Sequence, residues 1–188
     1  MATKITTGKV RFSYVSIFEP KANQGGQDKY SVTLLIPKSD TYTMNLIKGA
    51  MQEAKELYLS KNKGKQLPTN LKSTIHDGDG ERPSGGEFGA ECKGHYVMTV
   101  SSTTQPLIVD AQKKVITDPK EVYSGCYGRA IINFYVYDTQ GNKGISAGLQ
   151  GIMKLHDGEP LSGAVVTDKD WDDGWVDADA NDFDDLLG

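Results

Sequence analysis

The sequence predicts a mainly β protein: a small OB-type Greek-key β-barrel with one helical insertion, long loops and a flexible acidic C-terminal tail. Five or six segments rich in β-branched and aromatic residues support this prediction, and one stretch of helical periodicity lies between the second and third of them. The 188 residues fit one folded domain, and the 21 glycines suit a chain with many turns.

The first two predicted strands, residues 9–18 and 29–38, form a long hairpin across a polar, glycine-containing connection. The second strand alternates strictly between apolar and polar side chains, which is typical of a half-buried strand. One face carries Tyr30, Val32, Leu34 and Ile36, and the other carries Lys29, Ser31 and Thr33.

The next segment, from about residue 41 to about residue 61, has helical periodicity. Candidate N-caps precede it or lie at its start, and Asn62 and Gly64 mark its end. Its apolar stripe favours packing against the core over binding a partner. The stripe consists of Met44, Ile47, Met51, Ala54 and Tyr58.

The rest of the body consists of loops and strands. Residues 63–91 are polar and rich in Gly and Pro, which predicts a long loop with short strand pieces. Further strands are expected at 94–102, 106–110 and 128–138. A turn at 139–142 leads into a bent strand at 143–158.

The charge divides the chain into two predicted units, a basic body at 1–166 and an acidic tail at 167–188. The tail holds nine Asp and one Lys, a net charge of −8. The body holds 20 Lys and Arg against 16 Asp and Glu, a net charge of +4, which suits a polyanionic ligand. A tail that only maintains solubility is the alternative.

Catalytic and cofactor signatures fail one by one. His76, His95 and His156 lack the spacing of metal ligands, and the acidic turn at 76–81 departs from a calcium loop. We therefore expect no metal, no cofactor and no enzymatic activity. Cys92 and Cys126 indicate buried free thiols in a reducing compartment, and no apolar run is long enough for a membrane span, so we expect a cytoplasmic protein.

Basic and aromatic residues interleave along three predicted strands, the combination that binds single-stranded DNA through phosphate pairing and base stacking. Alternation in the last of these strands places Arg129, Tyr135 and Tyr137 opposite Ile132 and Phe134. Aromatic residues that pack in the core are the alternative interpretation. The candidate DNA-binding residues are Lys9, Arg11, Lys93, Tyr96, Tyr127, Arg129, Tyr135 and Tyr137.

Long motifs in this chain resemble a family of phage-type single-stranded DNA-binding proteins that was long classed as a domain of unknown function. The resemblance is carried by YSGCYGRAIINFYVYDTQGNKGISAGLQGIMKLHDGEPLSG (123–163), HDGDGERP (76–83), GHYVMTVSS (94–102) and QPLIVD (105–110). It implies an OB-type barrel with a helical insertion, a DNA groove on the barrel, a role in phage replication or recombination, and no enzymatic activity.

The end of the tail mixes acidic and apolar residues, which suits docking into a basic-rimmed hydrophobic pocket on a partner. We expect it to recruit replication or recombination proteins, while the Asp-rich stretch competes with DNA for the body. Gly188 ends the chain, whereas tails of this type commonly end at an aromatic residue. The candidate partner-binding residues are Trp175, Asp182, Phe183, Asp184, Asp185, Leu186 and Leu187.

The predicted function is therefore to coat single-stranded DNA without strong sequence preference, as a monomer or homodimer with no membrane association. Two alternatives from other classes stay open. The first is a structural or protein-interaction module of a phage, such as a scaffold or virion component. The second is a nuclease, which the scarcity of carboxylates on the predicted strands disfavours.

Overall fold

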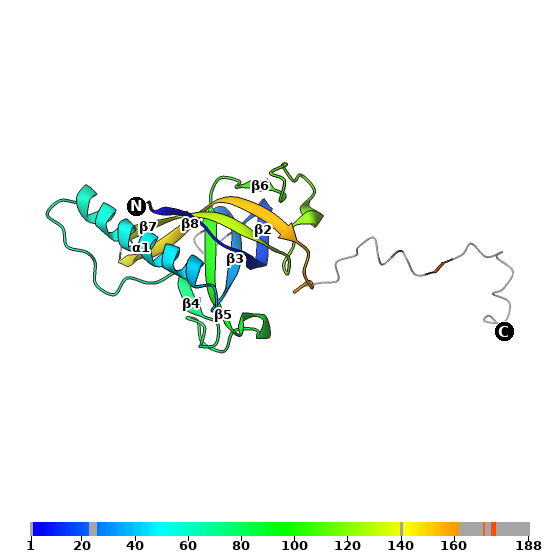
Figure 1. The fold of residues 1–188 in the computed structure, drawn as a ribbon. Coiled ribbons are helices and arrows are strands. Elements are labelled where there is room, and N and C mark those ends of the chain that lie inside the picture. The colour runs from blue at the N-terminus through cyan, green and yellow to red at the C-terminus, as the bar shows by residue number, and fades with distance from the viewer. Residues whose placement is uncertain (1, 23–25, 140, 162–170, 172–173, 176–188) are drawn as a thin grey trace.

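A computed structural model describes residues 2–22, 26–139, 141–161, 171 and 174–175. Long strands and one long helix dominate it, with short strands and two 3-10 turns between them (Figure 1). In chain order the elements are β1 Lys4–Thr6, β2 Val10–Ala22, β3 Asp28–Pro37, α1 Thr41–Lys61, β4 Ile75–Asp77, η1 Ala90–Cys92, β5 His95–Ser102, β6 Leu107–Val109, η2 Pro119–Glu121, β7 Tyr127–Thr139 and β8 Asn142–His156.

Five of the strands close into a ring. The hydrogen-bonded order is β2, β3, β5, β8, β7 and back to β2, and every pairing is antiparallel except that of β5 with β8. This is the five-stranded Greek-key ring of an OB barrel, so the predicted fold class is confirmed. β1 adds to the edge of β7, β6 adds to the edge of β8, and β4 adds to β5.

The ring closes through a narrow seam between β5 and β8. These two strands share one registered pair, Ser101 with Gly148. Next to that pair, residues 72–74 lie between the two strands and bond to both of them. The Ile145 amide of β8 donates to the Lys72 carbonyl, and the Thr74 hydroxyl donates to the Thr99 carbonyl of β5. The predicted loop at 63–91 therefore supplies a short strand and helps to close the barrel.

The core fills the inside of the ring. The alternation predicted for residues 29–38 is confirmed, because Val32, Leu34 and Ile36 are buried inside while Ser31 and Thr33 face outward. The same holds for β7, where Ile132 and Phe134 point inward. The largest fully buried side chains are Phe12, Phe134, Ile17, Leu34, Leu35, Ile36, Ile47, Met98 and Ile132.

α1 covers the barrel beside β1 and β7 (Figure 1). Its predicted span is confirmed, and the Asp40 carboxylate caps it by accepting from the Thr43 amide at 3.0 Å. Ile47, Ala50 and Ala54 bury their side chains in the main core, so the stripe is a packing face as expected. Both cysteines are buried and free, which also agrees with the sequence.

The residues of the predicted tail lie mostly outside the described part of the chain. Beyond residue 161 the structure describes only 171 and 174–175, so the boundary at residue 166 and the roles of residues 182–187 stay predictions. Within the described part, no helix combines the length and apolar character needed to cross a bilayer.

Candidate nucleic-acid interface

The outward sides of β2, β3 and β5 form a groove floored by short hydroxyl side chains, which we call the groove face. Cross-strand register aligns Ser13 with Thr33 and Thr33 with Thr99, and the two threonine hydroxyls lie 3.1 Å apart. The groove has a volume of about 380 Å³. Its lining residues are Ser13, Tyr14, Ser31, Thr33, Leu35, Arg82, Phe88, Glu91, Cys92, Val97 and Thr99.

Tyr14 stands out on this face because its side chain is 68% exposed in the middle of a strand. Its φ of 47° lies in the left-handed region, which is rare for a bulky residue and costs about 1–2 kcal/mol. A register shift between Ser13 and Ser16 accompanies this conformation. Such strain in an exposed aromatic residue is typical of a position that serves ligand binding.

A bulge at Tyr14 breaks the strict alternation expected of the predicted strand at residues 9–18. Simple alternation places Phe12 and Tyr14 on one face, as possible core residues. Phe12 is fully buried, but the bulge turns Tyr14 out of the barrel. Val15 and Ile17 then take the inward positions. The apolar spacing along the strand, two residues, then three, then two, is the signal in the sequence for this bulge.

One wall of the groove comes from the long connection between α1 and β5. The Arg82 guanidinium lies 5.8 Å from the centroid of the Phe88 ring, and Phe88 packs with Leu35 and Val97 on the groove face. Cys92 completes this small apolar cluster. Burial raises the pKa of its thiol, and the nearby Glu91 carboxylate adds to the effect, so Cys92 stays a neutral wall residue.

An ion-pair clamp holds that wall against the barrel. The Lys38 ammonium lies 2.6 Å from Asp77 Oδ1 and 2.7 Å from Asp79 Oδ2, and the second oxygen of Asp79 accepts from the Gly94 amide. The bonds to Lys38 lower the pKa of both carboxyl groups. The two Asp carboxylates of the acidic turn at 76–81 thus both pair with the Lys38 ammonium. No cluster of three or more potential metal ligands occurs among the described residues.

Two lysines extend the groove face toward the tip of the β2–β3 hairpin. Lys21 pairs directly with Lys29 across the strands, and Lys29 shares the outward side of β3 with Ser31 and Thr33. Like charges in directly opposed positions repel each other and destabilise a hairpin. The pair is therefore costly for folding alone, and it suits a site that receives an anionic backbone.

A row of small side chains continues the groove face across the strands to β7, and we call the whole stretch from β2 to β7 the band. The row starts at Ser31 on β3 and continues through Ser101 and Gly148 to Asn133. A Cβ built on Gly148 would lie 3.8 Å from the Tyr135 ring and 4.0 Å from the Ser101 carbonyl, so Tyr135 borders this row. Its side chain is 44% exposed. Tyr14 and Tyr135 thus bracket a band of serine, threonine and glycine.

The other predicted DNA-binding residues do not gather at this band. Tyr127 stacks on His156 with a centroid separation of 4.8 Å. The Lys9 ammonium and the Arg11 guanidinium lie 5.8 and 5.5 Å from the centre of the same ring. Arg11 also donates to the Gly125 and Glu159 carbonyls, so its guanidinium holds the chain together there.

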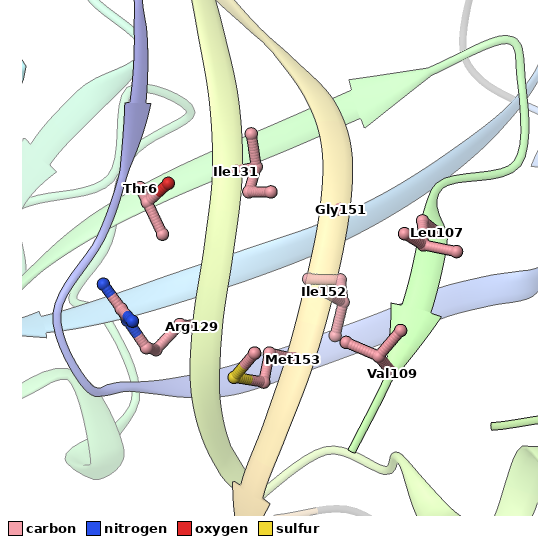
Figure 2. Close-up of a pocket in the computed structure, with 8 residues that line it drawn as sticks. All are labelled: Thr6, Leu107, Val109, Arg129, Ile131, Gly151, Ile152 and Met153. Carbon is pink, nitrogen blue, oxygen red and sulfur yellow. The ribbon is translucent and has the colours of Figure 1, made fainter. Parts of the chain in front are cut away.

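Arg129 and Tyr135 share the outward side of β7, as alternation predicts, but they are six positions apart, which is about 20 Å along the strand. The Arg129 guanidinium donates to the Thr7 carbonyl at 2.8 Å. It lines a separate apolar pocket of about 70 Å³, well below the roughly 300 Å³ at which ligand pockets begin (Figure 2).

The remaining three predictions divide between the core and the edges of the site. The Tyr96 ring packs against the main core beneath the Lys38 ammonium, on the opposite side of β5 from Thr99. Tyr137 covers Gly144, where an added Cβ would lie 2.8 Å from the phenol oxygen. Lys93 is exposed and directly follows Cys92 of the groove wall. Contact of any of these residues with DNA stays a prediction.

Comparison with known proteins identifies the family. Residues 3–184 match the family described as "Enterobacter phage Enc34, ssDNA-binding protein". The chain belongs to this family. A curated relative, "Putative protein p50" of Acyrthosiphon pisum secondary endosymbiont phage 1, is 31% identical over 180 residues, covering 90% of this chain and 93% of the relative. The resemblance in the sequence motifs is thereby confirmed.

Solved structures of family members have the same fold. The single-stranded DNA-binding protein from bacteriophage Enc34 in complex with ssDNA is 26% identical, with a TM-score of 0.72 over 85% of this chain and 90% of that one. A C-terminal truncation of the same protein is 27% identical, with a TM-score of 0.70 over 85% and 89%. The T7 protein gp2.5, 14% identical with a TM-score of 0.58 over 93% and 98%, shares the fold alone.

Proposed function

We propose that this protein binds single-stranded DNA along the groove face. The observation that carries the proposal is Tyr14, an exposed aromatic side chain held at a positive φ over a floor of hydroxyl groups. Membership in a family of phage ssDNA-binding proteins supports it. In an OB barrel the outward face of the second and third strands, here β3 and β5, is the common site for oligonucleotides.

Bases would stack on Tyr14 at one end of the band and on Tyr135 at the other, each contact contributing about 1–3 kcal/mol. The Arg82 guanidinium over Phe88 offers a third flat surface. The floor between them consists of small hydroxyl groups such as Thr33 and Thr99, which suit every base equally. Binding without strong sequence preference follows from this composition.

Phosphates would pair with the lysines that border the groove face. Lys21 and Lys29 lie on neighbouring strands near the tip of the β2–β3 hairpin. Lys93 directly follows η1, at the groove wall. Each phosphate neutralised in this way releases counterions, so affinity falls as salt rises. The +4 charge of the body favours the same ligand.

The decisive experiment replaces Tyr14 by glycine and measures binding to oligo-dT by fluorescence anisotropy. Glycine adopts a positive φ without strain, so Tyr14→Gly keeps or raises the melting temperature while removing the ring. We expect affinity to fall roughly 5- to 150-fold, the equivalent of one lost stack. Tyr42→Ala, at an equally exposed tyrosine on α1, is the matched control.

A folded Tyr14→Gly protein with unchanged affinity would show that the groove face does not bind DNA. Comparing oligo-dT with the matching duplex tests the wider proposal. A structural or interaction module of the phage would bind neither DNA, so the anisotropy would not change. A nuclease would cleave DNA when divalent cations are added. We infer a non-enzymatic role in phage DNA replication or recombination, performed in the host cytoplasm.

The acidic tail, residues 167–188 beyond a DNA-binding domain at 1–166, is proposed to compete with DNA for the body. The last continuous described residue, Leu161, supports this proposal. Its amide donates to the Ser124 carbonyl, and its side chain packs against the cluster of Leu35, Val97 and Cys92 on the groove face. The chain therefore leaves the body beside the groove, with a net charge of −8 to follow.

Truncation after Val166 tests the competition. We expect the truncated protein to bind oligo-dT more tightly than the full chain, with the largest difference at low salt, because screening weakens the attraction between tail and body. Equal affinities at every salt concentration would contradict the competition. Recruitment of replication or recombination proteins by the acidic, apolar end would be tested separately, by comparing partner capture with the full and truncated chains.

A further inference from the structure

The small pocket that contains Arg129 lies on an apolar surface outside the groove. The pocket is lined by residues of four neighbouring strands, β1, β7, β8 and β6, and we call the outward surface of these strands the back face. Leu107, a large apolar residue, is 59% exposed there. Figure 2 shows Arg129 and Thr6 on one side of the pocket and Leu107 and Val109 on the other. The full lining is Thr6, Leu107, Val109, Arg129, Ile131, Gly151, Ile152 and Met153.

The back face joins an apolar floor to a basic border. Ile131 and Met153 supply the floor, and the Arg129 guanidinium lies at its edge. The next outward residue of β7 is Tyr127, whose ring is approached by the Lys9 ammonium and the Arg11 guanidinium. A ligand that suits this surface carries apolar side chains next to negative charges.

The end of this chain has that chemistry. Residues 182–187 read Asp-Phe-Asp-Asp-Leu-Leu, with three apolar side chains and three carboxylates in six positions. We propose that this segment docks on the back face of its own chain, with Phe183 or Leu186 against Ile131 and Met153 and the carboxylates toward Arg129. The proposal concerns the body of this protein as the receptor, and it is independent of how DNA binds.

The length of the tail permits this docking. Twenty-one residues lie between Leu161 and Phe183, and this connection extends to about 75 Å at most. A body of this size has a radius of gyration of about 15 Å, so the end can reach any point on it. The pocket is too small for a nucleobase-sized ligand but accepts the tip of one apolar side chain, since its volume is about 70 Å³.

Methionine methyl NMR on the full chain tests the docking directly. The chain has five methionines, and Met153 lines the pocket, so selective ¹³C-methyl labelling gives few signals with one reporter at the site. A Met153→Leu variant assigns that signal. We expect Phe183→Ala/Leu186→Ala/Leu187→Ala to shift the Met153 methyl resonance and to leave the other four unchanged, which also shows that the fold is intact.

A matched control removes apolar groups from the start of the tail. Val165→Ala/Val166→Ala leaves residues 182–187 in place and should not move the Met153 signal. An unchanged Met153 signal in the triple variant would overturn the proposal, as would an equal shift in the control. A Met153 shift that disappears on dilution would replace it with docking between copies. DNA is absent throughout, so these results are separable from the test of DNA binding.

Discussion

The groove face and the back face are outward surfaces of the same closed sheet, yet they expose different chemistry. On the groove face, the middle of β3 and β5 exposes serine and threonine beside the small apolar cluster of Leu35 and Val97, and an exposed ring lies at each end of the band. On the back face, the equivalent positions of β7 and β8 carry Ile131 and Met153 beside an arginine. Strand alternation fixes which residues face outward, and residue type then decides what each side can bind.

The two faces should differ most in the loss of oligo-dT affinity when two side chains are removed from one face or the other. The double variant Tyr14→Gly/Tyr135→Ala loses two stacks, about 2–6 kcal/mol, which corresponds to roughly a 30-fold or greater loss of oligo-dT affinity. Ile131→Ala/Met153→Ala on the back face should change affinity by less than about twofold in about 0.2 M salt, where the charge of the tail is screened.

Anisotropy titrations of both double variants, alongside circular dichroism to confirm folding, check this prediction. If the back-face variant lost as much affinity as the groove variant, the assignment of DNA to the groove face would be wrong. An intermediate loss in Tyr135→Ala alone would show that DNA spans the whole band from β2 to β7.

The second comparison concerns lysine pairs. Lys21→Ala/Lys29→Ala removes two phosphate contacts, so the slope of log affinity against log salt should become shallower by about 1.4, with a several-fold loss of affinity at low salt. Lys113→Ala/Lys114→Ala removes the same charge from the turn after β6 and should leave the slope unchanged. Equal slopes for the two variants would exclude specific phosphate contacts at the hairpin.

The smallest effect is expected at the clamp behind the groove wall. Because Lys38 lowers the pKa of Asp77 and Asp79, their stabilising contribution is present above the ordinary Asp pKa and is lost as pH falls through the lowered values. Lys38→Met keeps the apolar stem over the Tyr96 ring. Melting curves of the variant and the wild type should differ at pH 7 and converge near pH 2. A constant difference would assign the effect to packing.

Much of the fold follows from the sequence because alternation and helical periodicity report burial directly. The strand at 29–38, the helix at 41–61 and the strand at 128–138 all have one apolar side, and the structure places them as expected. The groove was harder to predict. Ser31 and Thr33 look like ordinary solvent-facing residues, and Arg82 and Phe88 belong to a loop whose path no periodicity describes.

Strand length and strand pairing explain why the predicted site residues scatter. Arg129 and Tyr135 lie on one side of one strand, but about 20 Å of β7 separates them, so they have different neighbours. In the barrel, the β5–β8 seam brings Tyr135 beside Ser101, while the Arg129 side chain lies next to β1 and donates to the Thr7 carbonyl. Tyr14 was missed for a different reason, since a single bulge reverses the alternation of β2 between Phe12 and Val15.

The seam between β5 and β8 has a consequence for the motion of the barrel. One registered pair and a few hydrogen bonds from residues 72–74 hold this junction, whereas β7 and β8 pair along their whole length. Backbone amides there should exchange with deuterium before those of the β7–β8 ladder. A DNA strand lying across Ser101 and Gly148 would bridge the junction from outside. Amide exchange at this junction should therefore be slower in the DNA-bound protein than in the free protein.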